Sequence, residues 1–164
     1  MPKRSETGGF TLIEIIIVVT MIAIFMAMLA PAYQRITLKA QATTYFNDMR
    51  VYAESLSRHA LERGKYPADQ TSSPAFPAEM DGFMDRTRWT SPSPIGGYYD
   101  WDSADTPSGR ALPHQGAIGL NRSNLRHDQY QQLDEWFDDG DLSTGQIRLY
   151  GGVRLFYLLE NKSG

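Results

Sequence analysis

Residues 10–30 read FTLIEIIIVVTMIAIFMAMLA, and this stretch decides how the rest of the chain can fold. Its only charged side chain is Glu14. A helix of about 20 apolar residues spans the roughly 30 Å hydrocarbon core of a bilayer. A helix that is apolar on every side is either a membrane span or a fully buried core helix. The remaining chain is too small and too polar to bury such a helix on all faces, so the stretch is predicted to cross a membrane.

The residues before this stretch indicate its orientation. Residues 1–9 read MPKRSETGG and carry Lys3, Arg4 and the α-amino group against Glu6. Positively charged flanks remain on the cytoplasmic side, so the residues after the helix are expected on the far side of the membrane. A secretory signal places its small-residue cleavage site after the apolar core, whereas here a glycine pair precedes the core. Cleavage after Gly9 would therefore remove a polar leader and leave the apolar helix in place.

Glu14 is the one residue that a plain membrane span does not explain. A carboxylate inside the hydrocarbon core costs a few kcal/mol, and such a residue by itself indicates a function. Its partner must be basic, and the stretch contains no other charged side chain. Cleavage after Gly9 would create a basic group, because Phe10 would then carry a new α-amino group at helical spacing from Glu14. The alternative is that Glu14 lies near the headgroups and extends its carboxylate to water.

Residues 9–14, GFTLIE, followed by the long apolar run, resemble the class III signal of type IV pilins and type II secretion pseudopilins. The resemblance implies that a prepilin peptidase cuts after Gly9 and methylates the new amine of Phe10. It also implies that Glu14 pairs with the N-terminal amine of a neighbouring subunit during filament assembly. Pro31 matches a position where members of this family commonly carry a proline that loosens the helix, and a kink is expected there.

Beyond Pro31 the sequence predicts that the helix continues to about residue 62. No glycine interrupts the chain from Phe10 to Arg63, and Gly64 and Pro67 then end the helix. Apolar residues recur at three- and four-residue spacing, which predicts an amphipathic helix packed on a core. They are Leu38, Ala42, Tyr45, Met49, Tyr52, Leu56 and Ala60. A coiled-coil partner is the other explanation of this stripe, but sustained heptads are absent.

The C-terminal part of the sequence predicts a small head. Residues 65–97 are rich in Pro, Ser, Asp and Gly, and we expect an irregular loop with one short helical turn near residues 79–85. Strands are expected at 98–101, 117–120, 146–150 and 153–159, and an amphipathic helix is expected at 124–137. Gly151 and Gly152 separate the last two strands and are typical of a two-residue hairpin turn.

These elements define an α+β fold, in which a long N-terminal helix (about 10–62) packs with its distal half on a small C-terminal antiparallel sheet. The expected organisation is a leader at 1–9, a transmembrane and assembly helix at 10–30, an amphipathic continuation at 31–63 and a head at 64–164. The positive flank directs this head to the periplasm, on the outer side of the bacterial inner membrane that the resemblance implies.

Charge and cysteine content exclude several classes of function. Lysine and arginine number 16 against 19 aspartate and glutamate, which gives a net charge of −3 and no basic surplus for a phosphate backbone. The chain has no cysteine, so disulfide scaffolds, thiolate zinc sites and thiol catalysis are excluded. Many pilus-forming pilins close a C-terminal loop with a disulfide, and the lack of cysteine therefore favours a secretion-type pseudopilin.

Residues 134–141, DEWFDDGD, place five carboxylates around a glycine turn. Calcium prefers several oxygen ligands in a flexible loop, so Asp138, Asp139 and Asp141 form a candidate calcium site. The spacing does not match the loop of an EF-hand. The favoured interpretation is nevertheless a helix C-terminus whose acids face solvent, so that the protein is predicted to hold no metal and no cofactor, with calcium at this turn as the alternative.

The sequence lacks the motifs of common enzymes. His59, His114 and His127 stand apart, and each is expected to be a surface histidine or a partly hydrogen-bonded one. No nucleophile elbow, zinc-protease motif or phosphate-binding glycine loop occurs. A membrane-anchored hydrolase that uses the acidic cluster is therefore disfavoured, and the chain is predicted not to be an enzyme.

The sequence is interpreted as a pseudopilin or minor pilin of a type II secretion pseudopilus or a type IV pilus-like filament. It would be a single-pass protein with a cytoplasmic N-terminus and a periplasmic head until it is extracted into the filament. The partners that the resemblance implies are other pilin-like subunits, the prepilin peptidase and an inner-membrane assembly platform. The alternative is a membrane-anchored periplasmic binding module whose head recognises a secreted substrate, a surface or DNA. DNA is disfavoured by the acidic balance.

Overall fold

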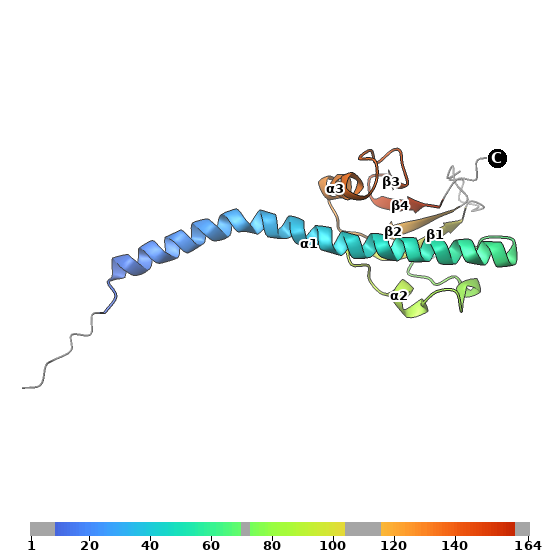
Figure 1. Cartoon of the computed structure of the whole chain (residues 1–164), viewed down its shortest axis with the longest axis horizontal. Coiled ribbons are helices and arrows are strands. Elements are labelled where there is room, and N and C mark those ends of the chain that lie inside the picture. The colour runs from blue at the N-terminus through green and yellow to red at the C-terminus, as the bar shows by residue number, and fades with distance from the viewer. Residues whose placement is uncertain (1–8, 70–72, 104–115, 160–164) are drawn as a thin grey trace, which may run out of the picture. The chain divides into compact units, whose positions relative to one another are not determined.

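The computed structural model describes residues 9–69, 73–103 and 116–159. The chain forms two compact units, which divide between Leu38 and Lys39. One long helix, α1 (Leu12–Arg63), contributes residues to both units. The second unit also holds the sheet and the shorter helices that are labelled in Figure 1.

The long helix that the sequence predicts is confirmed, although α1 begins slightly later than residue 10. Pro31 lies inside the helix, which continues through this position, and a kink of the axis there stays a prediction. At the other end, the Gly64 N–H donates to the Ala60 carbonyl at 2.8 Å. Gly64 has a φ of 76°, a left-handed conformation that commonly ends helices and that suits glycine. The helix therefore ends at the glycine, as the sequence predicts.

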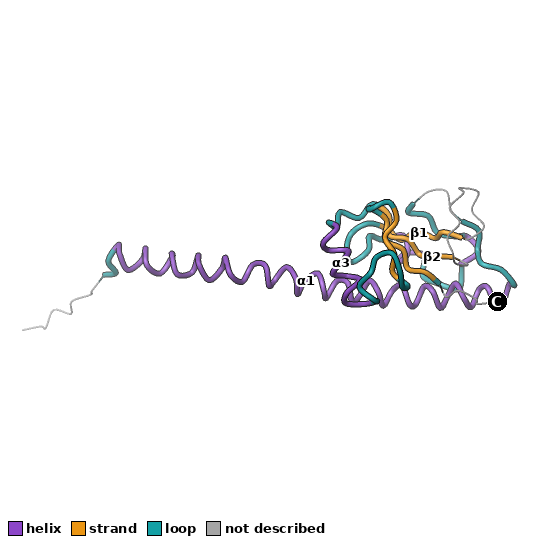
Figure 2. Tube along the Cα trace, turned by 90° about the horizontal axis from the view of Figure 1, so that it is seen from above, coloured by secondary structure: helices purple, strands orange, loops and turns teal. Residues whose placement is uncertain are grey.

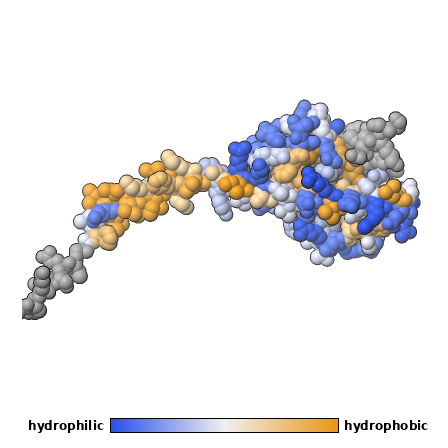
Figure 3. Space-filling view, viewed as in Figure 1, coloured by the Kyte–Doolittle hydropathy of each residue, from blue (hydrophilic) through white to orange (hydrophobic). Residues whose placement is uncertain are grey.

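In the first unit, α1 exposes apolar side chains around its whole surface. The large apolar residues from Phe10 to Ile36 are between 47% and 84% exposed. Figure 3 shows this surface as a nearly continuous hydrophobic region. By length and composition α1 could cross a membrane, and no other helix in the described part of the chain could. An apolar helical surface of this extent requires lipid or other protein around it.

Four antiparallel strands form one sheet in the second unit, as the sequence predicts. Their order in the sheet, which the sequence does not predict, is β1-β2-β4-β3. The strands are β1 (Tyr98–Ser103), β2 (Gly116–Asn121), β3 (Ile147–Tyr150) and β4 (Arg154–Leu158). β3 and β4 form the predicted hairpin, but its turn contains Val153 besides the two glycines, because Tyr150 pairs with Arg154. Gly151 and Gly152 have φ of 61° and 73°, which only glycine adopts without strain.

The core of the second unit lies between the sheet and the distal half of α1, which run side by side in Figure 2. Tyr99 of β1 packs against two tyrosines of α1, with ring centroids 6.0 Å from Tyr45 and 5.1 Å from Tyr52. The predicted apolar stripe is confirmed, because its central members are between 0% and 3% exposed. These members are Ala42, Tyr45, Met49, Tyr52 and Leu56. Burial of this stripe is what joins the helix to the sheet.

Trp101 is the largest residue of this core together with Trp89, and it is fully buried. Its indole N–H donates to the Pro67 carbonyl at 2.9 Å, so its polar atom is satisfied. A side chain at Gly116 on the neighbouring strand would overlap the indole ring. The absence of a side chain at position 116 therefore makes room for the tryptophan.

The segment between α1 and β1 contains more helix than the sequence predicts. The 3-10 helix η1 (Ala78–Met80) falls in the expected helical turn, whereas α2 (Arg86–Thr90) is not anticipated. Asp85 caps α2 by accepting hydrogen bonds from its first backbone N–H groups at 2.8 and 3.2 Å. Trp89 is fully buried and donates to the Ala75 carbonyl at 2.7 Å, so it anchors the segment on the core.

α3 (His127–Phe137) confirms the predicted helix but begins later than residue 124. The reason is local hydrogen bonding before the helix. The Leu125 N–H donates to the Ser123 hydroxyl at 3.2 Å, and the Arg126 N–H donates to the Gln129 side chain at 2.9 Å. The second bond is half of a capping box, and it fixes the helix start after Arg126.

Candidate functional site

The N-terminal motif forms a compact set of hydrogen bonds at the start of α1. Glu14 Oε2 accepts from the Thr11 backbone N–H at 2.9 Å and from the Thr11 hydroxyl at 2.8 Å. The Glu14 N–H in turn donates to Thr11 Oγ1 at 3.3 Å. This reciprocal pairing is a capping box, whose sequence signature is T-x-x-E. The signature is present in residues 11–14, so the role of Thr11, which was not predicted, could have been read from the sequence beside Glu14.

This arrangement gives the Glu14 carboxylate a partner within its own chain. A carboxylate in the first turn also faces the positive end of the helix dipole, which stabilises its charge. Contacts within a single chain therefore hold the Glu14 carboxylate in a defined position. Its pairing with the N-terminal amine of a neighbour stays a prediction.

Gly9 and Phe10, the residues of the predicted cleavage site, lie before the helix and are exposed. A Cβ at Gly9 would meet no atom within 4 Å, and Phe10 is 84% exposed. Packing against the described residues therefore does not require glycine at position 9. A strict requirement for glycine there would come from another protein that binds the motif. Cleavage after Gly9 and methylation of Phe10 stay predictions.

The C-terminal end of α3 brings three carboxylates together. One oxygen from each of Asp134, Asp138 and Asp139 lies within 4.8 Å of the others. Asp141, which belongs to the calcium site expected from the sequence, is not part of this group. Its carboxylate accepts hydrogen bonds from the Ser143 N–H at 2.9 Å and from the Ser143 hydroxyl at 2.6 Å. The structure therefore groups Asp138 and Asp139 with Asp134 instead of Asp141.

Asp134 differs from the other two carboxylates because it has no exposed surface. Among the residues that the structure describes, none donates a hydrogen bond of ordinary geometry to either of its oxygens, although the Gly140 backbone N–H lies close enough to lower its pKa. Burial, followed by the charges of Asp138 and Asp139, raises the pKa of Asp134 to about 6. Asp134 follows Tyr130 by one helical turn and lies on the buried face of α3. This helical spacing is the pattern from which the burial of Asp134 could have been predicted.

Asp138 and Asp139 close the turn that follows α3. Asp138 Oδ2 accepts from the backbone N–H groups of Gln146 at 2.5 Å and Ile147 at 2.7 Å, where β3 begins. Asp139 Oδ2 accepts from the Thr144 hydroxyl at 2.8 Å. Through these bonds the acidic turn joins the end of α3 to the start of β3.

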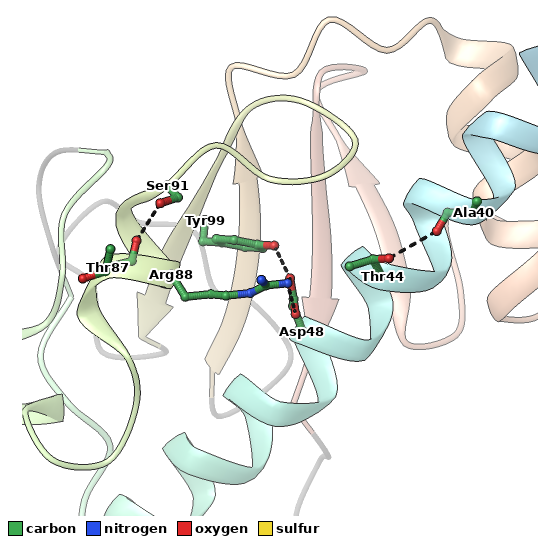
Figure 4. A network of polar contacts seen from close by, with 7 residues as sticks. All are labelled: Ala40, Thr44, Asp48, Thr87, Arg88, Ser91 and Tyr99. Atoms are coloured by element: carbon green, nitrogen blue, oxygen red, sulfur yellow. Dashed lines mark hydrogen bonds and ion pairs between the residues drawn. The ribbon is translucent and has the colours of Figure 1, made fainter.

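A second polar cluster lies inside the second unit (Figure 4). The Arg88 guanidinium of α2 donates to both oxygens of Asp48 on α1 at 2.9 Å, and the Tyr99 hydroxyl of β1 donates to Asp48 Oδ2 at 2.9 Å. Burial and the hydrogen bond to Asp48 raise the pKa of Tyr99. Asp48 thus has two side-chain partners, and the cluster joins α1, α2 and β1.

The two histidines in the described part of the chain differ in burial. His59 is not a surface residue: it is 2% exposed and packs edge-on against Phe83 with ring centroids 5.0 Å apart. The physical reason is its helical spacing from Leu56, which places it on the buried stripe of α1. His127 is exposed at the start of α3, and His114 lies outside the described residues.

Comparisons with known proteins agree with the N-terminal motif and with the fold. Residues 4–30 match the family model of the prokaryotic N-terminal methylation motif. The type II secretion system core protein G of Pseudomonas aeruginosa is 29% identical over 87 residues, which cover 53% of this chain and 61% of that protein. The type IV major pilin protein PilE1 of Neisseria gonorrhoeae is 36% identical over 64 residues, which cover 39% of each chain.

A solved structure of the major type IV pilin PilA1 from Clostridium difficile has the same fold, with a TM-score of 0.51. The superposition covers 76% of this chain and 97% of that pilin, at 12% sequence identity. The chain spans less than two thirds of the length of the sequence relatives given above. The chain therefore carries an N-methylation motif, is similar to a type II secretion protein and to type IV pilins, and has the type IV pilin fold.

Proposed function

We propose that this chain is a structural subunit, a pseudopilin or minor pilin, of a type II secretion pseudopilus or a type IV pilus-like filament. A prepilin peptidase cuts after Gly9, the new amine of Phe10 is methylated, and Glu14 guides the subunit into the filament. Its role is assembly, and the relatives named above are a secretion-system core protein and pilins. The lack of cysteine favours the secretion pseudopilus over the pilus.

The observation that carries this proposal is the exposed apolar half of α1 with the Thr11–Glu14 capping box at its start. In the inner membrane this surface contacts lipid, with the N-terminus in the cytoplasm and the head in the periplasm. In a filament the same surface packs on the helices of other subunits, so lipid contacts are replaced by protein contacts. The assembly platform of the inner membrane is the partner that brings subunits together.

When the chain moves from the membrane into a filament, Glu14 gains a second partner. In a filament its carboxylate lies close to the methylated amine of a neighbouring Phe10, and the ion pair is excluded from water. Removing one member of a buried ion pair costs about 3–5 kcal/mol, because the other charge is then buried alone. Thr11 keeps the carboxylate at the helix start until the neighbour arrives.

The test measures incorporation of the full chain into sheared filaments in a host that lacks the wild-type copy. Glu14→Val is expected to be processed to a mature protein that starts at Phe10 but to enter filaments at least about 100-fold less than wild type. The matched control is Thr20→Val, which also replaces a polar residue of the apolar segment. Within the described residues the Thr20 hydroxyl bonds to the Ile16 and Ile17 carbonyls of its own helix, both at 2.8 Å, so this variant is expected to assemble normally.

In the same experiment, Gly9→Val tests cleavage by the peptidase. The peptidase is expected to leave this variant as a precursor that retains residues 1–9 and stays in the membrane. Wild-type levels of Glu14→Val in filaments would contradict the assembly role of the carboxylate. If the wild-type chain itself never enters filaments, the membrane-anchored binding module becomes the better explanation.

A further inference from the structure

We infer that an open cavity at the C-terminal end of α1 binds a carboxylate group of another polypeptide. The cavity has a volume of about 490 Å³ and lies between the end of α1 and the segment that contains η1. Cavities of about 300–1,000 Å³ hold small ligands, so this one fits a short peptide segment. Its lining residues are His59, Arg63 and Lys65 on the side of α1, and Ala78, Glu79 and Asp81 on the side of η1.

His59 gives this cavity a polar group that its own surroundings do not satisfy. The side chain is 2% exposed, and its Nδ1 has no hydrogen-bond partner among the described residues. The ring packs against Phe83, with ring centroids 5.0 Å apart, and an aromatic ring does not replace such a partner. A neutral imidazole carries one N–H donor and one acceptor, and buried polar groups in proteins are nearly always hydrogen-bonded. A ligand in the cavity would supply a partner for the imidazole.

The charges on the two walls of the cavity do not balance. Arg63 and Lys65 form no ion pair with the described residues, and the same holds for Glu79 on the opposite wall. Asp81 is already neutralised, because its two oxygens accept hydrogen bonds from Arg86 at 2.9 and 2.8 Å. Two cations therefore face one uncompensated carboxylate. The excess positive charge favours a ligand group with one negative charge.

The arrangement of these charges selects a peptide carboxylate over a phosphate. The guanidinium of Arg63 can hold either group through two parallel hydrogen bonds. Glu79 lies on the opposite wall, where it repels a doubly charged phosphate and can accept a hydrogen bond from an N–H group. A peptide offers a carboxylate and a backbone N–H close together. The carboxylate comes from an acidic side chain or from the end of a chain, and either source has the same chemistry.

The experiment measures binding of dye-labelled peptides to the full chain in detergent by fluorescence anisotropy. Three short alanine peptides serve as probes. The first has a central glutamate and blocked ends, the second has a free C-terminal carboxylate, and the third has a central glutamine and blocked ends. At least one of the two carboxylate peptides is expected to bind saturably, and the tighter of the two identifies the source of the carboxylate. The glutamine peptide is expected to bind at least about tenfold more weakly.

Three variants of exposed residues locate the site without disturbing the core. Arg63→Gln removes a cation of the cavity and is expected to weaken binding at least about tenfold. Ala78→Phe fills the cavity without a change of charge and is expected to abolish binding. The matched control is Lys39→Gln, which removes a cation from the same helix outside the cavity and is expected to bind the peptide like wild type.

An NMR titration of the chain with ¹⁵N-labelled histidine reports on His59 directly. Its ring signals, identified by their loss in His59→Gln, are expected to shift with the bound fraction of peptide. The exposed His127 of α3 is the internal control and is expected not to shift. If His59→Gln does not fold, the anisotropy measurements on the exposed variants still decide the question.

Four results would overturn the inference. The first is an absence of saturable binding of both carboxylate peptides to the wild-type chain, in which case Arg63 and Lys65 only compensate the dipole of α1. The second is equal binding of the glutamine peptide. The third is unchanged binding in Ala78→Phe and Arg63→Gln, which would place the peptide elsewhere. The fourth is competition by inorganic phosphate at the affinity of the peptide, which would make the cavity a general anion site. These measurements use the isolated chain, so none of them depends on assembly into filaments.

Discussion

Ile24 and Leu56 lie on the same helix, yet Ile24 is 57% exposed and Leu56 is fully buried. The difference does not come from hydrophobicity, because both side chains are aliphatic and similar in size. It comes from the pattern around them: apolar residues surround the helix at Ile24, whereas at Leu56 they are confined to one stripe. The periodicity of the sequence thus tells which half of α1 packs on the head of its own chain.

The two halves also differ in what their side chains contribute to stability. In the second unit, each buried apolar side chain adds about 1.5–3 kcal/mol to folding, because folding removes it from water. In the first unit the apolar side chains keep the same surroundings whether the head is folded or not. Substitutions in the two halves are therefore expected to have clearly different effects on the unfolding free energy of the full chain in detergent.

The largest effect is expected for Trp101→Ala. Trp101 is fully buried and donates to the Pro67 carbonyl, so truncation leaves a large cavity and an unpaired carbonyl. The expected loss is about 3–5 kcal/mol, or roughly 10–15 °C in Tm. The control is Leu61→Ala, because Leu61 is 84% exposed and its replacement is expected to stay within about 0.5 kcal/mol of wild type. Equal Tm values for the two variants would show that the helix–sheet core does not hold the head together.

A smaller loss, of about 1–3 kcal/mol, is expected for Asp48→Ala. This substitution leaves the Tyr99 hydroxyl without its acceptor in a buried position. Arg88→Ala should cost less, about 1 kcal/mol or below, because the Arg88 side chain is 53% exposed and water can replace it. Chemical denaturation measures both values.

A double variant tests the prediction for Asp48→Ala. Adding Tyr99→Phe to Asp48→Ala removes the stranded hydroxyl, so the double variant should be less destabilised than the sum of the two single variants. Strict additivity would mean that the hydrogen bond between Tyr99 and Asp48 contributes nothing to stability.

The smallest effect is expected for Ile24→Ala, which should change the unfolding free energy of the head by less than about 0.5 kcal/mol. Leu56→Ala is its matched partner on the buried stripe and should lose about 2–5 kcal/mol. Denaturant melts of the two variants in the same detergent compare the halves of α1 directly. A clear destabilisation by Ile24→Ala would contradict the prediction that the first half of α1 does not stabilise the head.

The elements with strong local patterns were predictable from the sequence. α1 follows from an apolar run, a stripe and a terminal glycine, and the β3–β4 hairpin follows from strand-forming residues around Gly151 and Gly152. The α2 helix was not predictable, because it is short and prolines surround it. The Asp85 cap is local, but the burial of Trp89 depends on tertiary packing, and a five-residue helix has too few positions to show a periodic pattern.

The candidate sites also differ in how far the sequence alone predicts them. The cleavage motif and Glu14 stand in a short segment, so their spacing alone indicates a function. The Asp48 cluster joins residues that are 40 and 51 positions apart, and no local pattern reveals such a pairing. Asp134 is an intermediate case. Its helical spacing from Tyr130 places it on a buried face, but an aspartate is usually exposed to solvent.

Trp101 and Gly116 occupy one shared volume, since any side chain at position 116 would overlap the indole ring. The constraint runs in one direction: position 101 can shrink while 116 stays glycine, but 116 cannot gain a side chain while 101 is tryptophan. An alanine at 116 requires a smaller residue at 101, and a tryptophan at 101 permits only glycine at 116. In an alignment of related heads, the two columns should covary, and a redesign of this core should select both residues in a single step.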